Sequence, residues 1–270
     1  MKKNLLLIAL TLGLFTDLAL TNLVGNAKPI TNSGNATNGT QIARTRPRLR
    51  GGLPFRVRKV RASGNLEAGA ARGSCNAQQD ITALVPPNPK EKKGKGPVEL
   101  TLSDRPTFFV NIPKTTAQQA EFLLRDENQG ILLRETIDLT ANNGVAHYTL
   151  PSSFPGLEVG KQYVWRFSLS CDPDDRSGDA RTSGLVKRVK PEAAVAQQLA
   201  RAKSNTDRLP IYANNGYWLE TLKVLNDLRA ANPNDQTLVQ DWKTVFSTAG
   251  LGQFASQPVF ELKGTPVAGF

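Results

Sequence analysis

The chain has 270 residues and a formal net charge of +11 at pH 7, from 34 Lys and Arg against 23 Asp and Glu. It contains one histidine and two cysteines, so it lacks the clustered ligands of a zinc centre, and it has no Gly-x-Ser-x-Gly motif of a serine hydrolase. We therefore expect a protein that is not an enzyme, with no catalytic, metal-binding or cofactor-binding residues and no cofactor.

Residues 1–27 have the organisation of an export signal. Two lysines precede an apolar segment at 5–15, and Gly25-Asn26-Ala27 places small residues at the positions that a signal peptidase recognises. The apolar segment is shorter than the roughly 20 residues that span a bilayer, and Asp17 follows it. The prediction is cleavage after Ala27 and a mature protein that is periplasmic or extracellular, with an uncleaved anchor as the alternative.

Residues 28–72 carry most of the excess positive charge, since ten Lys or Arg accompany a single acid, Glu67. Few apolar residues are present, which predicts a basic, disordered arm. A solvated linker is the simplest interpretation. The alternative is attraction to anionic lipid or wall polymer, at about 1 kcal/mol per basic residue. Nucleic acid is not an expected partner, since Phe55 is the only aromatic residue among the arginines.

Residues 73–190 are predicted to form a β-sandwich. Short segments rich in β-branched and aromatic residues alternate there with turn residues, at the spacing typical of all-β domains. Seven such strands favour an immunoglobulin-like or fibronectin-like sandwich. The predicted strands cover residues 98–102, 107–112, 120–126, 131–139, 145–150, 161–171 and 181–189.

The segment 157–171 is the most informative part of this region. Leu157, Gly160 and Tyr163 have the spacing of a tyrosine corner, in which the tyrosine hydroxyl bonds to nearby backbone. The strand that follows places its aromatic residues on one face, as a core strand does. Trp165 is therefore expected in the core, and it would serve as a sugar-stacking platform only if it were exposed.

Cys75 and Cys171 are the only cysteines, and behind an export signal they predict a structural disulfide. A redox pair is the alternative, but the two residues lack the close Cys-x-x-Cys spacing of such pairs. The bond would close a loop of almost a hundred residues and stabilise the domain by about 4 to 5 kcal/mol.

A cluster of carboxylates follows the second cysteine, at Asp172, Asp174, Asp175 and Asp179. A polar turn is the preferred interpretation. A calcium site is the alternative, although the spacing departs from that of an EF-hand. His147 lies in a predicted strand and is expected at the surface or on an edge strand.

The chain changes to a helical period after residue 190. We expect a helical subdomain at 191–258 and a flexible tail at 259–270. Asp235 is the predicted N-cap of the last helix, because Asp at that position accepts a hydrogen bond from the first turn. The predicted helices cover residues 191–203, 206–214, 217–231 and 234–248.

Part of this region resembles a tetratricopeptide helical hairpin. Tyr212, Gly216 and Pro233 have three of the characteristic spacings of that repeat, while Thr221 and Leu228 stand where the repeat has small residues. An independent solenoid needs about three repeats. We therefore expect this single hairpin to dock on the sandwich.

Trp218 and Trp242 flank the hairpin and are expected to form its seam with the sandwich. An exposed Trp here would instead be the best anchor for a partner, since aromatic residues dominate binding hot spots. The candidate partner-binding residues are therefore Trp218, Trp242 and Tyr212.

Several blocks of the sequence together resemble a cyanobacterial family of exported proteins known as domain of unknown function 928. The resemblance covers roughly residues 73–258, and it implies location and architecture but no activity, cofactor or catalytic residue. The blocks that carry it are Arg72 to Cys75 with Leu84-Val85-Pro86, Asp104 to Phe108, Ala120-Glu121-Phe122 with Arg125-Asp126, Leu157 to Pro173, Arg176 to Asp179, and Tyr212 to Trp242.

These observations favour a non-enzymatic adaptor that binds a protein partner in the cell envelope through the helical subdomain and the adjacent sandwich edge. The alternative is a carbohydrate-binding or wall-polymer-binding module, in which the basic arm supplies the electrostatic attraction. Oligomeric state is not predicted.

Overall fold

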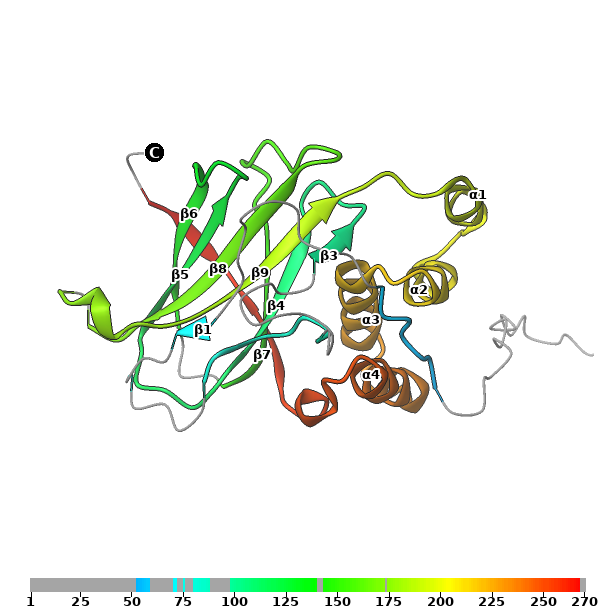
Figure 1. The fold of residues 1–270 in the computed structure, drawn as a ribbon. Coiled ribbons are helices and arrows are strands. Elements are labelled where there is room, and N and C mark those ends of the chain that lie inside the picture. The colour runs from blue at the N-terminus through cyan, green and yellow to red at the C-terminus, as the bar shows by residue number, and fades with distance from the viewer. Residues whose placement is uncertain are drawn as a thin grey trace, which may run out of the picture. The chain divides into compact units, whose positions relative to one another are not determined.

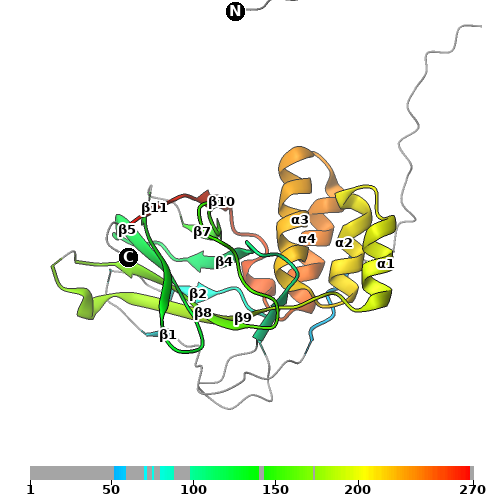
Figure 2. The same ribbon diagram turned by 90° about the horizontal axis from the view of Figure 1, so that it is seen from above.

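The computed structural model describes residues 52–58, 70–71, 75, 80–87, 98–139, 143–172 and 174–267. Two β-sheets form the core, and four helices lie beside them (Figures 1 and 2). The predicted export signal at 1–27 falls outside the described residues. Within the described ranges, no helix has both the length and the apolar character needed to span a membrane.

The first sheet has seven strands in the order β1-β9-β8-β5-β6-β11, with β3 also paired to β9. Its pairs are antiparallel except β3 with β9, which is parallel. The strands are β1 (Ala70–Ala71), β3 (Val98–Thr101), β5 (Gln119–Arg125), β6 (Ile131–Asp138), β8 (Gln162–Ser170), β9 (Ala180–Arg188) and β11 (Gly264–Pro266).

The second sheet has four strands in the order β10-β7-β4-β2. In this sheet β4 is antiparallel to both β7 and β2, whereas β10 runs parallel to β7. The strands are β2 (Thr82–Ala83), β4 (Thr107–Ile112), β7 (Gly144–Thr149) and β10 (Val259–Leu262).

The inward faces of the two sheets share one aromatic core. Because side chains alternate along a strand, Trp165 and its neighbours at every second position of β8 point inward. The Phe108 ring of β4 lies 5.1 Å from that of Trp165 and 5.3 Å from that of Phe122 in β5. Gly184 of β9 makes room for the indole, since a Cβ there would lie 2.6 Å from two of its ring atoms.

The seven predicted strands between residues 98 and 189 are confirmed, with ends that differ by at most one residue. The tyrosine corner is also present, because the Glu158 backbone N–H donates a hydrogen bond of 2.9 Å to the Tyr163 hydroxyl. Trp165 is 1% exposed and is a core residue.

The four predicted helices are confirmed, and the short 3-10 helices η1 (Arg176–Gly178) and η2 (Gly252–Phe254) accompany them. Asp235 caps the last helix as predicted, since its carboxylate accepts from the Thr237 N–H at 2.8 Å. Ser204 and Asp207 form a capping box at the start of the second helix. The helices are α1 (Ala193–Arg201), α2 (Asn205–Asn214), α3 (Trp218–Ala231) and α4 (Gln236–Thr248).

The prediction of a flexible tail at 259–270 is wrong for residues 259–262 and 264–266, which form β10 and β11. β10 adds to the second sheet beside β7, and β11 adds to the first sheet beside β6. Leu262, which ends β10, is buried. The backbone pairing and the buried Leu262 side chain explain why this segment is ordered. Neither feature is evident from the sequence of a short segment of mixed composition.

Residues 52–58 belong to the predicted disordered arm, yet here they form an extended strap against the helices. The Arg56 N–H donates to the Ala213 carbonyl at 3.0 Å, and the Phe55 N–H donates to the Thr248 hydroxyl at 2.8 Å. Leu53 and Phe55 are both buried in the main core. The expectation of disorder is therefore wrong for this strap, because its two apolar side chains are buried against the rest of the protein.

Candidate functional site at the sheet–helix junction

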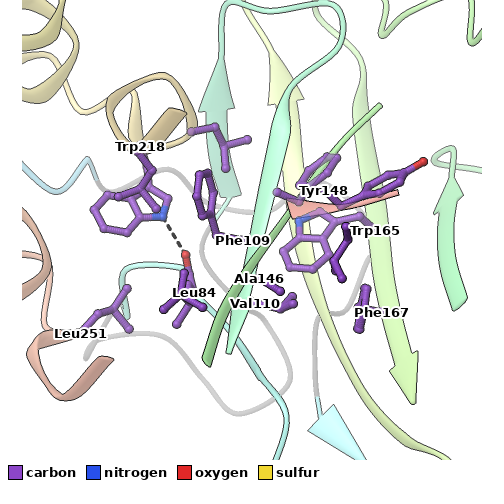
Figure 3. Close-up of a cluster of buried hydrophobic side chains, with 14 of the residues drawn as sticks. Leu84, Phe109, Val110, Ala146, Tyr148, Trp165, Phe167, Trp218 and Leu251 are labelled. Atoms are coloured by element: carbon purple, nitrogen blue, oxygen red, sulfur yellow. Dashed lines mark hydrogen bonds between the residues drawn. The ribbon is translucent and has the colours of Figure 1, made fainter. Parts of the chain in front are cut away.

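The helices are fastened to the sheets by Trp218, the first residue of α3. Its indole N–H donates a hydrogen bond of 2.7 Å to the carbonyl of Leu84, and Figure 3 shows this bond. The Phe55 ring of the strap meets the indole edge-on, with 4.8 Å between ring centroids, and Phe246 of α4 lies 5.9 Å away. The side chain of Trp218 thus contacts the strap, the segment after β2 and helix α4 at the same time.

The strap continues to the turn between α2 and α3. Gly216 adopts a φ of +70°, and a Cβ there would lie 2.4 Å from the Arg58 side chain. The left-handed φ and the close approach both require glycine. The Arg58 guanidinium forms an ion pair with Glu192 and lies 5.5 Å from the centroid of the Tyr217 ring.

Glu99 is a buried carboxyl at this junction, and it is 5% exposed. Its Oε2 accepts a hydrogen bond of 3.3 Å from the Trp165 indole N–H, while Oε1 has no hydrogen-bond partner among the described residues. Burial raises the pKa of Glu99 to about 8, and the charge of Glu220 adds to this while the Trp165 bond opposes it. Glu99 is therefore protonated at neutral pH.

Glu220 of α3 reaches the end of β3. One of its oxygens accepts from the Thr101 hydroxyl at 2.6 Å, from the Leu102 N–H at 2.6 Å and from the Ser103 N–H at 3.2 Å. Burial raises the pKa of Glu220 in spite of these bonds, which favour its charged form. The carboxyl connects α3 to the first sheet.

A small cavity lies at this junction, between the strap, β3 and α3. The space inside it that admits the centre of a water molecule is about 20 Å³, and one water needs roughly 10 to 15 Å³ of such space. The cavity therefore holds little more than a single water. Its lining residues are Phe55, Val57, Arg58, Val85, Pro86, Val98, Glu99, Leu100, Gly216 and Trp218.

The three predicted partner-binding residues differ in their accessibility. Trp218 is 2% exposed and Trp242 is 1% exposed, so both lie inside the protein. The Trp242 ring packs 4.6 Å from that of Phe246, and the Arg229 guanidinium covers it at 4.5 Å. Tyr212 is half-buried. Of the three, Tyr212 alone presents part of its side chain to solvent.

The contribution of the Trp218 hydrogen bond can be measured against a matched tryptophan. Trp218→Phe is expected to lower the free energy of unfolding by about 2 to 3 kcal/mol, because it leaves the buried Leu84 carbonyl without its donor and leaves a small void. The control is Trp242→Phe, since the Trp242 N–H has no hydrogen-bond partner among the described residues. Urea denaturation of both variants gives the comparison, and equal losses would contradict the assigned role.

The predicted disulfide between Cys75 and Cys171 is present, with 4.7 Å between the two Cα atoms. The carbonyl of Cys75 also accepts hydrogen bonds from the hydroxyls of Thr115 and Thr116. The bond thus fixes the segment before β2 to the end of β8. Disulfides are typical of oxidising compartments outside the cytoplasm.

In the loop predicted as a polar turn, with a calcium site as the alternative, three of the four carboxylates are engaged in local bonds. Asp172 accepts from the Asp174 N–H at 2.9 Å, and Asp175 accepts from the Ser177 N–H at 2.9 Å. Asp179 is ion-paired with Arg176. Across the part of the chain that the structure describes, no group of three or more His, Cys, Asp or Glu side chains is arranged to hold a metal ion.

The expectation of an edge strand for His147 is wrong, and its side chain is half-buried where a surface position was the other expectation. It lies on β7, between β4 and β10, where its Nε2 is 3.2 Å from the Asn226 amide of α3. Burial lowers the pKa of this histidine. The helices that cover this face of the second sheet account for the difference.

Sequence reasoning missed the pair Glu99 and Glu220. Glu99 lies between two apolar residues of a strand, a pattern that normally places the charged side chain outward. The sequence predicts that its hydrogen-bond partner, Trp165, lies in the core. It does not show that β3 turns the side chain of Glu99 toward that indole.

The described residues define a disulfide-bonded domain of two sheets with an attached layer of four helices. The chain belongs to the family described as Domain of Unknown Function (DUF928), whose model matches residues 67–259. This confirms the resemblance inferred from the sequence blocks. No curated protein matches the chain.

Proposed function

We propose that this protein is an exported, non-enzymatic adaptor of the cell envelope that binds a protein partner on its helical layer. The observation that carries the proposal is the half-buried side chain of Tyr212 in a partly buried apolar patch of α1 and α2. The junction cavity, at about 20 Å³, has no room for a larger ligand. A partner that uses this region therefore binds on the outer surface of the helices.

We further propose that the two sheets have an immunoglobulin-like topology, which many cell-surface binding domains share. In this interpretation the pair β4 with β7 corresponds to strands B and E of that fold, and the row β5-β8-β9 corresponds to strands C, F and G. Fold alone does not assign function, so the argument rests on the surface of the helices.

The tetratricopeptide-like hairpin is the part of the chain that we assign to partner binding. Gly216 forms its turn, and Thr221, which stands where the repeat has a small residue, is buried and donates its hydroxyl hydrogen to the Tyr217 carbonyl at 2.7 Å. The hairpin packs on the sheets through Trp218, so one of its faces is already used. We place the partner site on α1 and α2, which lie beside α3 (Figure 1).

The patch on these helices is apolar. Leu199, Ile211 and Tyr212 are partly buried and pack against a small cluster of Leu100 from β3, Val195 and Tyr217, which is separate from the main core. Partly exposed aromatic and aliphatic side chains held by a rigid base are typical anchors of protein interfaces. We therefore place the centre of the partner site at Tyr212.

The test is photo-crosslinking in cells with benzoylphenylalanine in place of Tyr212, and in place of Lys243 as a control. Lys243 is exposed on α4, in the same helical layer. A discrete protein adduct at position 212 and none at position 243 is the expected result. The same adducts at both positions, or adducts only to lipid or polysaccharide, would overturn the proposal.

A further inference from the structure

The outward face of the first sheet carries an array of arginines. Arg181 of β9, Arg166 of β8, Arg125 of β5 and Arg134 of β6 come from four strands that are consecutive in the sheet. All four lie at positions that alternate with core residues, and side chains at alternate positions share a face. Neighbouring strands are about 4.8 Å apart, so the four side chains cross the sheet as a band.

The register shows how this band is arranged. Arg166 stands opposite Leu123 on β5, and Leu123 stands opposite Arg134 on β6. Phe122 and Leu124 enter the core, so Leu123 between them points to the outward face of the sheet. Even so, Leu123 is only 1% exposed. The hydrocarbon stems of the two flanking arginines are suited to cover it. The guanidinium groups therefore lie low against the sheet.

The arginines of the band lie close enough for their charges to repel one another. Among the described residues, Glu121 is the acidic group that acts on Arg166, and its carboxylate lies 3.6 Å from the Nε atom of Arg134. Burial lowers the pKa of Arg166, and the charges of Arg125, Arg181 and Arg134 lower it further while Glu121 opposes them. This mutual repulsion is relieved when an anion binds.

Unused hydrogen-bond donors point to the same conclusion. The Nε atoms of Arg125, Arg166 and Arg181 are buried and have no hydrogen-bond partner within the described ranges. Buried donors normally have a partner. A carboxylate or sulfate group accepts two parallel N–H bonds from one guanidinium, and these charge-assisted bonds are among the strongest in proteins.

We propose that this arginine band binds a linear anionic polysaccharide, whose carboxylate or sulfate groups pair with successive guanidinium groups. A linear polymer fits because the cationic groups are spread over four strands. A membrane surface contacts side chains that protrude from a protein, whereas these guanidinium groups lie close to the sheet. A flexible polymer chain can follow the face of the sheet and reach them. This site is distinct from the helical patch and does not depend on a protein partner.

The test measures binding of the full-length mature chain to polygalacturonate and to dextran sulfate, with neutral dextran as the reference. Replacing Arg166 and Arg181 together by Gln is expected to weaken binding about a hundredfold or more, since each of the two lost charge-assisted bonds is worth about 1.5 kcal/mol or more, which is roughly a factor of ten. The control is the double replacement of Arg201 and Lys243 by Gln, which removes the same charge from exposed helical positions and should change affinity less than about twofold.

Two further variants separate a specific site from general attraction and from loss of folding. Replacing Arg166 and Arg181 by Lys keeps charge and stem but removes the planar fork, so an intermediate loss is expected. Glu121→Gln removes the opposing carboxylate and should tighten binding severalfold. Equal losses in the Gln variant and its helical control would overturn the proposal, as would binding only to vesicles of anionic lipid.

Discussion

Replacing Glu99 by Gln is expected to stabilise the protein at pH 8 and to remove much of the pH dependence of its stability. The wild-type carboxyl has a pKa of about 8 in the folded state against 4.5 for the free group, because it is buried at the junction. Between these two values the folded state holds a proton that the unfolded state has lost. The free energy of unfolding of the wild type therefore falls as pH rises from about 4.5 to about 8.

The size of the effect follows from the width of this window. One pKa unit corresponds to about 1.4 kcal/mol, so the full cost of Glu99 above pH 8 is roughly 4 to 5 kcal/mol. A neutral Gln keeps an oxygen that can accept from the Trp165 indole, and it has no proton to lose. The two proteins should have similar stability below pH 4.5 and diverge progressively above it.

Urea denaturation at a series of pH values from 4 to 9 measures this divergence. The control is Glu158→Gln, which removes an exposed carboxyl paired only with Lys161 among the described residues and should change stability by less than about 1 kcal/mol. A Glu99→Gln variant whose stability varies with pH as much as that of the wild type would show that Glu99 does not carry the linkage.

Local patterns in this chain predict the strands and helices because each element buries a face with its own period. The alternation around Trp165 and the cap at Asp235 are read directly from the sequence, and both are present in the structure. The pairing of Cys75 with Cys171 was equally accessible, since the two have no other partner. These features depend on residues that are close in sequence or unique in type.

The junction could not be predicted, because it depends on how distant segments meet. The strap at residues 52–58 and the strands β10 and β11 are short, and their order comes from backbone bonds to elements far away in the chain. The direction in which Glu99 points is set by the packing of β3. The arginine band likewise could not be predicted without the strand order. Arg166 and Arg181 lie on strands next to those of Arg125 and Arg134 because β9, β8, β5 and β6 are consecutive in the sheet.

Removal of the disulfide is expected to lower the free energy of unfolding by about 4 kcal/mol. The bond joins residues 96 positions apart, and in the chain-entropy model a loop of this length restricts the unfolded state by about 4 to 5 kcal/mol. Cys75 also keeps noncovalent ties, since its carbonyl accepts from the Thr115 and Thr116 hydroxyls. These ties hold the segment in place but restrict the unfolded chain far less than a covalent bond.

The measurement compares the wild type with a variant in which Cys75 and Cys171 are both replaced by Ala, each in urea with and without dithiothreitol. The wild type should lose stability in the reductant and approach the variant, while the variant should not respond to it. A wild type that keeps its stability after complete reduction would show that the hydrogen bonds of Cys75 and the packing around β8 maintain the fold without the covalent link. The variant contains no cysteine, since the chain has only these two. If its stability also fell in dithiothreitol, the loss in the wild type could not be assigned to reduction of the disulfide.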